Sequence, residues 1–291
     1  MEFTKNISVA HSPDADDIFM YEAINLGWVD TKNLSFSAVA DDIQTLNLAT
    51  INGLYDACAI SFGLYPFVCD DYALLDTAVS FGNGYGPKLI KRKNESLKRN
   101  FKVALSGEHT SNALLFRIAY PQARITYMNF LDIENAVLKG VVDAGVLIHE
   151  SILDFSDELE VEREIWDIWQ GLCGSDALPL PLGGMALRRS LPLGDACSVQ
   201  NILKKAVKVA RERKAELSKI LIEKNLVRVD DKKLAKYLEL YANDESIELS
   251  DIQLDALDKF FELGFAHGLY PRLIKARDNL IPKEYEDLRR Q

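Results

Sequence analysis

One short unit occurs twice along this chain, and it constrains the fold more than any other feature of the sequence. The first copy, GLYDACAIS, ends at Ser61, and the second, GVVDAGVLIH, ends at His149. In both copies a glycine and then an aspartate precede an apolar run, which is typical of a helix that turns into a strand. The repetition predicts two similar α/β lobes in which Ser61 and His149 occupy equivalent strand ends.

The end of the second copy is the more informative of the two. Val146–Ile148 is a short apolar run with β-branched residues, as expected for a strand covered on both faces. Ligands of open α/β sheets bind just beyond the carboxyl ends of strands. His149, which can accept a proton near neutral pH, stands at such an end. A core histidine hydrogen-bonded to the backbone is the alternative interpretation of this position.

Composition and charge exclude several classes of protein. The chain has 291 residues, 48% hydrophobic and 27% charged, which suits a globular protein of one large or two ordinary domains. A net charge of −10 argues against nucleic acid or an anionic membrane as the partner, although a local site can still bind a small anion. The N-terminal stretch has no apolar core of signal-peptide length, and no run is long enough to cross a bilayer, so we expect a cytoplasmic protein.

The cysteines give no sign of redox or metal chemistry. None belongs to a CxxC pair, and none has a local activating signature. We expect all of them to be reduced and structural: Cys58, Cys69, Cys173 and Cys197.

Strand and helix signals alternate from the N-terminus, and the chain has two candidate crossing points between lobes. Phe81–Lys88 contains three glycines and a proline, and Leu178–Met185 is rich in proline and glycine. Two crossings imply an inserted lobe of residues 85–185 within an outer lobe of residues 1–84 plus 186–291, whose C-terminal part is helical. A cleft between lobes joined in this way is a natural ligand site that closes by hinge bending.

Local patterns along the chain carry further expectations. Ser12 and Pro13 predict the start of a helix whose first turn holds Asp14, Asp16 and Asp17. Negative charge in a first turn interacts favourably with the helix dipole, and we prefer this explanation of the three aspartates to a metal site.

Farther along, Glu158–Gln170 reads as an amphipathic helix, and the basic run Lys204–Lys214 as the solvated face of another. His267, near the end of the last predicted helix, is expected to be structural.

Three histidines fall at predicted strand ends or in the loops after them, namely His11, His109 and His149. One hypothesis is a three-histidine zinc site, although no spacing resembles H-x-x-x-H and the three come from separate loops. The other hypothesis makes His149 a general base that faces a cleft.

The loop that ends at Thr110-Ser111 suggests what this cleft binds. Both residues stand at a predicted helix N-terminus, where hydroxyls and backbone N–H groups can hold a carboxylate or phosphate. Their alternative role is simple N-capping, and the two roles are compatible. Ser61 could supply another hydroxyl from the outer lobe. A Ser–His–Asp hydrolase is disfavoured, because the sequence contains no G-x-S-x-G elbow.

Several stretches taken together resemble one enzyme family over essentially the whole chain. The resemblance is to the 1,4-dihydroxy-6-naphthoate synthase family of the futalosine route to menaquinone, a group that also contains chorismate dehydratase. It rests on HSPDADDIFMYEAI, GNGYGPKLI, GEHTSNALL, GVLIHES and LPLPLGGMALRR, which occur in the family's order. Many members have SPCPND where this chain has SPDADD, and two threonines where it has Thr110-Ser111.

The resemblance implies an α/β chain with the two-lobed fold of type II periplasmic binding proteins. It also implies cleavage of cyclic dehypoxanthinyl futalosine into 1,4-dihydroxy-6-naphthoate and dihydroxyacetone, with no metal or organic cofactor. His149 matches the family's proposed proton acceptor. The positions that match the family's substrate contacts are Ala59, Ile60, Ser61, Thr110 and Ser111.

The function expected from the sequence is therefore a carbon–carbon lyase for a small anionic bicyclic substrate. Two alternatives stay open: the sister activity, chorismate dehydration, and a non-catalytic carboxylate-binding protein of the same fold. The sequence leaves the oligomeric state open.

Overall fold

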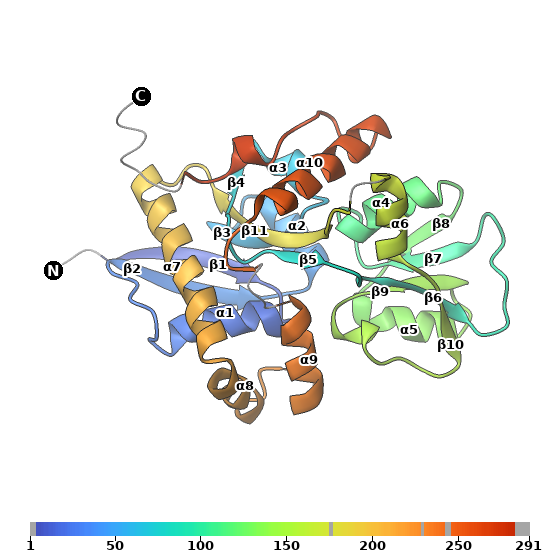
Figure 1. Ribbon diagram of the computed structural model, residues 1–291, viewed down its shortest axis with the longest axis horizontal. Helices are drawn as coiled ribbons and strands as arrows, with labels where there is room; N and C mark the ends of the chain where they lie inside the picture. Colours follow the sequence, from blue (N-terminus) through green and yellow to red (C-terminus); the bar gives the residue numbers. More distant parts are fainter. Residues whose placement is uncertain (1–3, 175–176, 228–229, 242–245, 283–291) are drawn as a thin grey trace.

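The computed structural model describes residues 4–174, 177–227, 230–241 and 246–282. Figure 1 shows two sheets side by side, each with its own helices. We call the first sheet and its helices the outer lobe, and the second sheet and its helices the inserted lobe. The chain enters the inserted lobe after β5 (Ser80–Gly82) and returns to the outer lobe at β11 (Leu180–Arg188).

The sheet of the outer lobe has the order β2-β1-β3-β11-β4, and β5 also pairs with β11. β1 is parallel to β2 and β3, whereas β11 is antiparallel to β3. The remaining strands are β1 (Lys5–His11), β2 (Leu34–Ala40), β3 (Ala57–Ser61) and β4 (Tyr72–Leu74).

The sheet of the inserted lobe has the order β10-β6-β9-β7-β8. β7 is parallel to β8 and β9, and β6 is antiparallel to β9 and β10. Its strands are β6 (Lys88–Arg92), β7 (Lys102–Leu105), β8 (Arg124–Tyr127), β9 (Ala144–Leu147) and β10 (Leu159–Glu164).

The repeated sequence unit has the same place in both sheets, as predicted. β1, β2 and β3 form one strand–helix–strand–helix–strand unit, and β7, β8 and β9 form another with the same order in space. Asp56 accepts a hydrogen bond from the backbone N–H of Ser8 in β1 at 2.9 Å, and Asp143 accepts one from Lys102 in β7 at 2.7 Å. Each aspartate thus ties the third strand of its unit to the first.

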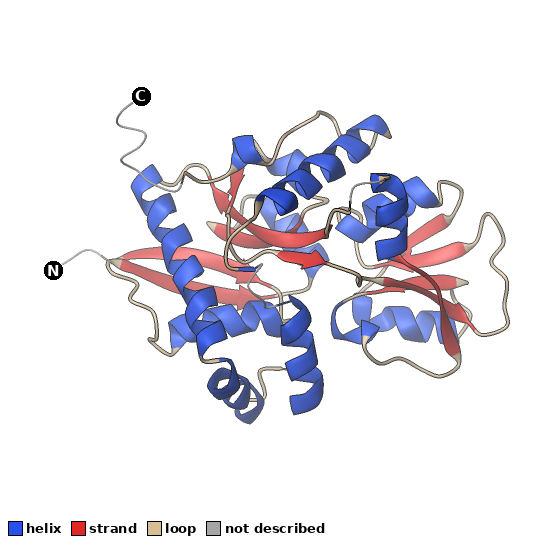
Figure 2. Cartoon of the chain, viewed as in Figure 1, coloured by secondary structure: helices blue, strands red, loops and turns tan. Residues whose placement is uncertain are grey.

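Helices lie on both sides of each sheet (Figure 2). In the outer lobe they are α1 (Ala15–Asn25), α2 (Ile43–Ile51), α3 (Tyr65–Val68), α7 (Leu193–Glu212), α8 (Lys214–Glu223), α9 (Asp231–Tyr241), α10 (Asp251–Ala266) and the 3₁₀ turn η3 (Arg277–Asn279). In the inserted lobe they are α4 (Ser111–Ala119), α5 (Phe130–Leu138), the 3₁₀ turn η1 (His149–Ile152) and α6 (Ile165–Cys173).

The predicted helix over Glu158–Gln170 is wrong in its first half. Leu159–Glu164 forms the edge strand β10, and the helix α6 begins only at Ile165. The charged side chains of this strand pair across to β6, where the Lys91 ammonium lies 2.9 Å from Glu162. Cross-strand pairing of opposite charges favours the strand over the helix that the apolar spacing suggested.

The second crossing point differs in detail from the prediction. β11 runs over Leu180–Arg188 in the outer sheet, with a shift in register between Pro181 and Gly183. Such an irregularity is where proline is tolerated in a strand. The division into residues 1–84 plus 186–291 and residues 85–185 stays a prediction, and we propose moving its second boundary to before Leu180.

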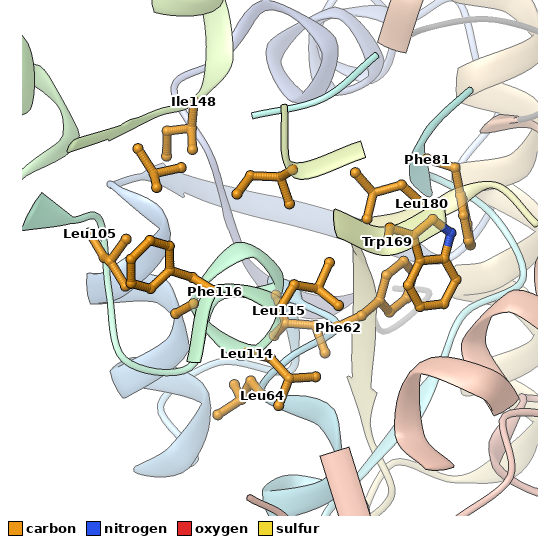
Figure 3. Close-up of a cluster of buried hydrophobic side chains, with 14 of the residues drawn as sticks. Phe62, Leu64, Phe81, Leu105, Leu114, Leu115, Phe116, Ile148, Trp169 and Leu180 are labelled. Carbon is orange, nitrogen blue, oxygen red and sulfur yellow. The ribbon is translucent and has the colours of Figure 1, made fainter. Parts of the chain in front are cut away.

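Apolar side chains of both lobes meet in one buried cluster (Figure 3). Phe62 and Leu64 of the outer lobe belong to it together with Leu114 and Leu115 of α4. α4 is therefore anchored to the outer lobe by packing as well as to its own sheet, which fixes the position of its N-terminus.

No helix in the described parts of the chain is long and apolar enough to cross a membrane.

Candidate active site

A cavity of about 140 Å³ lies between the two lobes. The outer lobe lines it with the end of β3, the start of α1 and the glycines of β11, and the inserted lobe with the start of α4 and the end of β9. The residues that the family resemblance matched to the proton acceptor and the substrate contacts all line this one cavity: Ala59, Ile60, Ser61, Thr110, Ser111 and His149. Their roles in binding or catalysis stay predictions.

His149 follows the end of β9 and opens the turn η1. Its backbone has φ of +54°, a left-handed conformation that non-glycine residues seldom adopt. The imidazole packs edge-on against Phe130, with ring centroids 5.0 Å apart. Its Nδ1 lies 2.6 Å from the Oδ2 atom of Asp14. Strained backbone at a cavity is typical of functional side chains that the surrounding structure holds in place.

Asp14 does not have the role that the sequence predicted for it. The helix α1 begins at Ala15, two residues later than expected, and Asp14 stands at its N-cap without a capping hydrogen bond from its side chain. The carboxylate is buried and accepts hydrogen bonds from the Ser12 hydroxyl and the His149 imidazole instead. The side chain of Asp16 lies outside the described residues.

Asp17 places a second carboxyl group at the cavity. The pKa of Asp17 is raised from 3.8 to about 7, mainly by burial and in addition by the neighbouring Asp14. The backbone N–H of Ser12, which donates to Asp17 at 2.7 Å, and the nearby His149 oppose this shift of the pKa. The first turn of α1 therefore contributes to an ionisable cluster in the cavity.

The hydroxyls of Thr110 and Ser111 are engaged within the protein. Thr110 caps α4 by accepting a hydrogen bond from the backbone N–H of Ala113 at 3.3 Å, as the capping interpretation expected. The Ser111 hydroxyl donates to the Leu182 carbonyl at 2.7 Å and accepts from the N–H of Gly63 at 3.2 Å. The N–H groups of Ser111 and Asn112, which precede the capped Ala113, have no carbonyl within the helix to bond, so they suit an anionic ligand group.

Gly63 shows how closely the two lobes approach beside the cavity. A Cβ atom on this residue would lie 2.7 Å from the carbonyl oxygen of His109 and 2.8 Å from that of Thr110. Both contacts are with backbone, which cannot move aside as a side chain can. The absence of a side chain at Gly63 therefore sets the distance between β3 and the start of α4.

Arg211 is a residue of the cavity that the sequence interpretation missed. It lies in the last turn of α7 and lines the cavity, together with Ser246. The prediction that the basic run Lys204–Lys214 is a solvated helix face is therefore wrong at Arg211, which borders the cavity. Amphipathic periodicity cannot reveal this, because it separates a buried face from an exposed one but not an exposed face from one that borders a cleft.

The other two histidines do not join His149. His11 stacks on Tyr21 with ring centroids 4.4 Å apart, and burial lowers the pKa of its imidazole. His109 packs against Phe67, and burial likewise lowers its pKa. Neither lines the cavity, and the described residues contain no cluster of three or more His, Cys, Asp or Glu side chains that could hold a metal ion. The three-histidine zinc hypothesis is therefore wrong.

The four cysteines are free and buried, as predicted. Burial raises the pKa of the Cys58 thiol to about 12, so a nucleophilic thiolate is disfavoured at this position.

Known proteins resemble this chain over most of its length. A 1,4-dihydroxy-6-naphtoate synthase from Streptomyces coelicolor is 27% identical over 274 residues, which cover 92% of this chain and 95% of that relative. The crystal structure of protein AF1704 from Archaeoglobus fulgidus is 33% identical and superposes with a TM-score of 0.83, covering 91% of this chain and 98% of the other.

The fold extends to more distant proteins that bind small molecules. The alkanesulfonate-binding protein SsuA from Xanthomonas axonopodis pv. citri, bound to MOPS, superposes with a TM-score of 0.70 at 14% identity, covering 94% of this chain and 97% of that protein. The two-lobed α/β fold is thus periplasmic-binding-protein-like, which confirms the fold class predicted from the sequence. Residues 7–266 match the protein family described as Menaquinone biosynthesis, and the chain belongs to that family.

Proposed function

We propose that this protein is a carbon–carbon lyase of menaquinone biosynthesis, which converts cyclic dehypoxanthinyl futalosine to 1,4-dihydroxy-6-naphthoate and dihydroxyacetone. Membership of the family and the name of the relative from Streptomyces coelicolor support this activity. The observation that carries the proposal is the imidazole of His149, held in a cavity that also contains a helix N-terminus and an arginine.

His149 acts as the general base in this proposal. Its Nδ1 faces the Asp14 carboxylate at 2.6 Å, and a carboxylate there accepts the Nδ1 proton. This tautomer leaves the lone pair on Nε2, which takes a proton from a substrate hydroxyl or an adjacent carbon. The carbon–carbon bond then breaks, and aromatisation of the bicyclic product drives the fragmentation.

Three groups around the cavity suit the functional groups of the substrate. The N–H groups at the start of α4 and the guanidinium of Arg211 would hold its carboxylate, because both favour an anion. The end of β3, at Ala59, Ile60 and Ser61, would contact the part of the substrate that leaves as dihydroxyacetone. These contacts orient the scissile bond relative to His149.

A cytoplasmic location is part of the proposal. Four free cysteines fit a reducing compartment.

The decisive experiment is an assay of the purified protein with cyclic dehypoxanthinyl futalosine. We expect its consumption with equimolar release of 1,4-dihydroxy-6-naphthoate and dihydroxyacetone, each quantified by liquid chromatography. The same preparation is assayed with chorismate. Dehydration of chorismate without cleavage of the first substrate would assign the sister activity, and tight binding without turnover of either would assign a binding protein.

A further inference from the structure

The partner of His149 comes from the other lobe. Asp14 precedes α1 in the outer lobe, and His149 follows β9 in the inserted lobe. We propose that Asp14 is a positioning residue that selects the basic tautomer of His149 and does so only when the lobes are together. This inference rests on the proposed function, because His149 is the base there.

The Asp14 carboxylate is itself held rigidly. Its residue is only 2% exposed, and its Oδ2 atom accepts the hydrogen bond of the Ser12 hydroxyl. The backbone N–H of Asp14 donates back to the Ser12 hydroxyl oxygen at 3.1 Å. A fixed acceptor at 2.6 Å determines both the ring orientation and the protonated nitrogen of His149.

The strained backbone of His149 points to the same role. A histidine with φ of +54° is less stable than the same residue in an ordinary conformation, so other contacts must hold it. The edge-on packing against Phe130 and the hydrogen bond with Asp14 are two such contacts. Only the second is polar, and it is the one that distinguishes the two ring nitrogens.

Other charged groups around the imidazole do not replace Asp14. Asp17 of α1 and Arg211 of α7 line the cavity, and Glu150 follows His149 in the turn η1. Among the charged residues near the imidazole, Asp14 is the one whose carboxylate oxygen lies 2.6 Å from Nδ1 of His149.

An ion pair elsewhere also spans the lobes and provides a control. Lys233 of α9 lies 2.6 Å from Asp154, which follows the turn η1. Asp154 is exposed and is not part of the cavity. Asp154→Asn removes the same charge from an interlobe pair as Asp14→Asn does, but it leaves the imidazole untouched.

The test compares Asp14→Asn, Asp14→Cys and Asp154→Asn with the unmodified protein. Asparagine keeps the shape of the side chain, and cysteine shortens it and removes both carboxylate oxygens. We expect kcat to fall about 10–100-fold in both Asp14 variants with KM changed less than about threefold, since positioning acts on the reacting geometry. Asp154→Asn keeps the unmodified kcat.

A second readout does not depend on turnover. Nitrogen-15 NMR of the four histidines distinguishes Nδ1–H from Nε2–H tautomers, and His149→Asn identifies the signal of His149. We expect the Nδ1–H form in the unmodified protein and a shift towards Nε2–H in Asp14→Asn. An unchanged tautomer in Asp14→Asn overturns the inference even if the enzyme is active. A protein inactive on the proposed substrate, with the tautomer shift present, overturns the proposed function alone.

Discussion

The imidazole Nδ1 of His149 and the carboxylate Oδ2 of Asp14 lie 2.6 Å apart across the cavity between the two lobes. The first residue ends a strand of the inserted lobe, and the second begins a helix of the outer lobe. A base assembled from both lobes has its working geometry only when the two lobes are placed as they are here.

His149 should be indispensable for turnover. We expect His149→Asn to lower kcat about 10²–10⁴-fold, the range for loss of a general base, because asparagine tolerates the left-handed backbone but cannot accept the proton. Steady-state kinetics on the proposed substrate checks this. His267→Asn, at the exposed end of α10, is the control and should keep full activity. A loss smaller than about tenfold in a folded His149→Asn protein would contradict the role of base.

Arg211 should bind the substrate carboxylate. Replacing it with methionine removes a charged hydrogen bond, which contributes about 1.5–3 kcal/mol, so kcat/KM should fall about 10–100-fold, mainly through KM. Lys208→Met is the matched control, because Lys208 is an exposed cation on the same helix α7 and does not line the cavity. Equal effects of the two substitutions would show that only the overall charge matters.

Asp17 should make stability depend on pH in a direction opposite to that of most carboxylates. Burial raises its pKa from 3.8 to about 7 in the folded protein, so its contribution to stability is complete below pH 3.8 and is lost as the pH rises to about 7. Asp17→Asn removes the ionisable carboxyl group, so the variant does not lose this stability as the pH rises. We therefore expect the variant to exceed the unmodified protein by about 1 kcal/mol or more at pH 8 and to show no such gain at pH 4.

Denaturant unfolding at both pH values measures this difference. Asp154→Asn serves as the control, because the Lys233 ammonium lowers the pKa of Asp154 and the variant should gain nothing at pH 8. The same free energy of unfolding for Asp17→Asn and the unmodified protein at pH 8 is the outcome that speaks against a raised pKa of Asp17 in the folded protein.

Gly63 should tolerate no side chain. A Cβ atom would lie 2.7 Å and 2.8 Å from two backbone oxygens of the other lobe, so Gly63→Ala should lower the free energy of unfolding by about 1–3 kcal/mol and reduce activity by separating β3 from α4. Gly171→Ala is the matched control, since it lies in α6 with no atom within 4 Å of the added Cβ. That change should stabilise the protein by about 0.5–1 kcal/mol. Equal stabilities of the two variants would refute the close approach.

Local chemistry made much of the fold predictable. The glycine and aspartate of each repeat mark a helix end and a turn, and the apolar runs that follow are strands β3 and β9. The capping box at Ser250 and Gln253 marks the start of α10 in the same way. These features are short-range, so a single segment carries them.

The predictions of secondary structure failed where contacts with a distant segment determine the local conformation. Leu159–Glu164 is a strand because its charges meet Lys91 on β6, although its spacing suited a helix. Leu180–Leu182 joins the outer sheet because Pro181 lies at a register shift opposite β5. Neither partner is visible within the segment itself.

The sequence by itself determined which residues could carry chemistry. The repeat places Ser61 and His149 at strand ends, and a separate capping pattern places the Thr110-Ser111 pair at a helix start. Tertiary structure decided which charged residues accompany them. Asp14 faces His149, and Arg211 borders the cavity, only because two lobes from separate stretches of chain pack against each other. Charge pairing and cavity lining depend on distances through space, and sequence patterns record only distances along the chain.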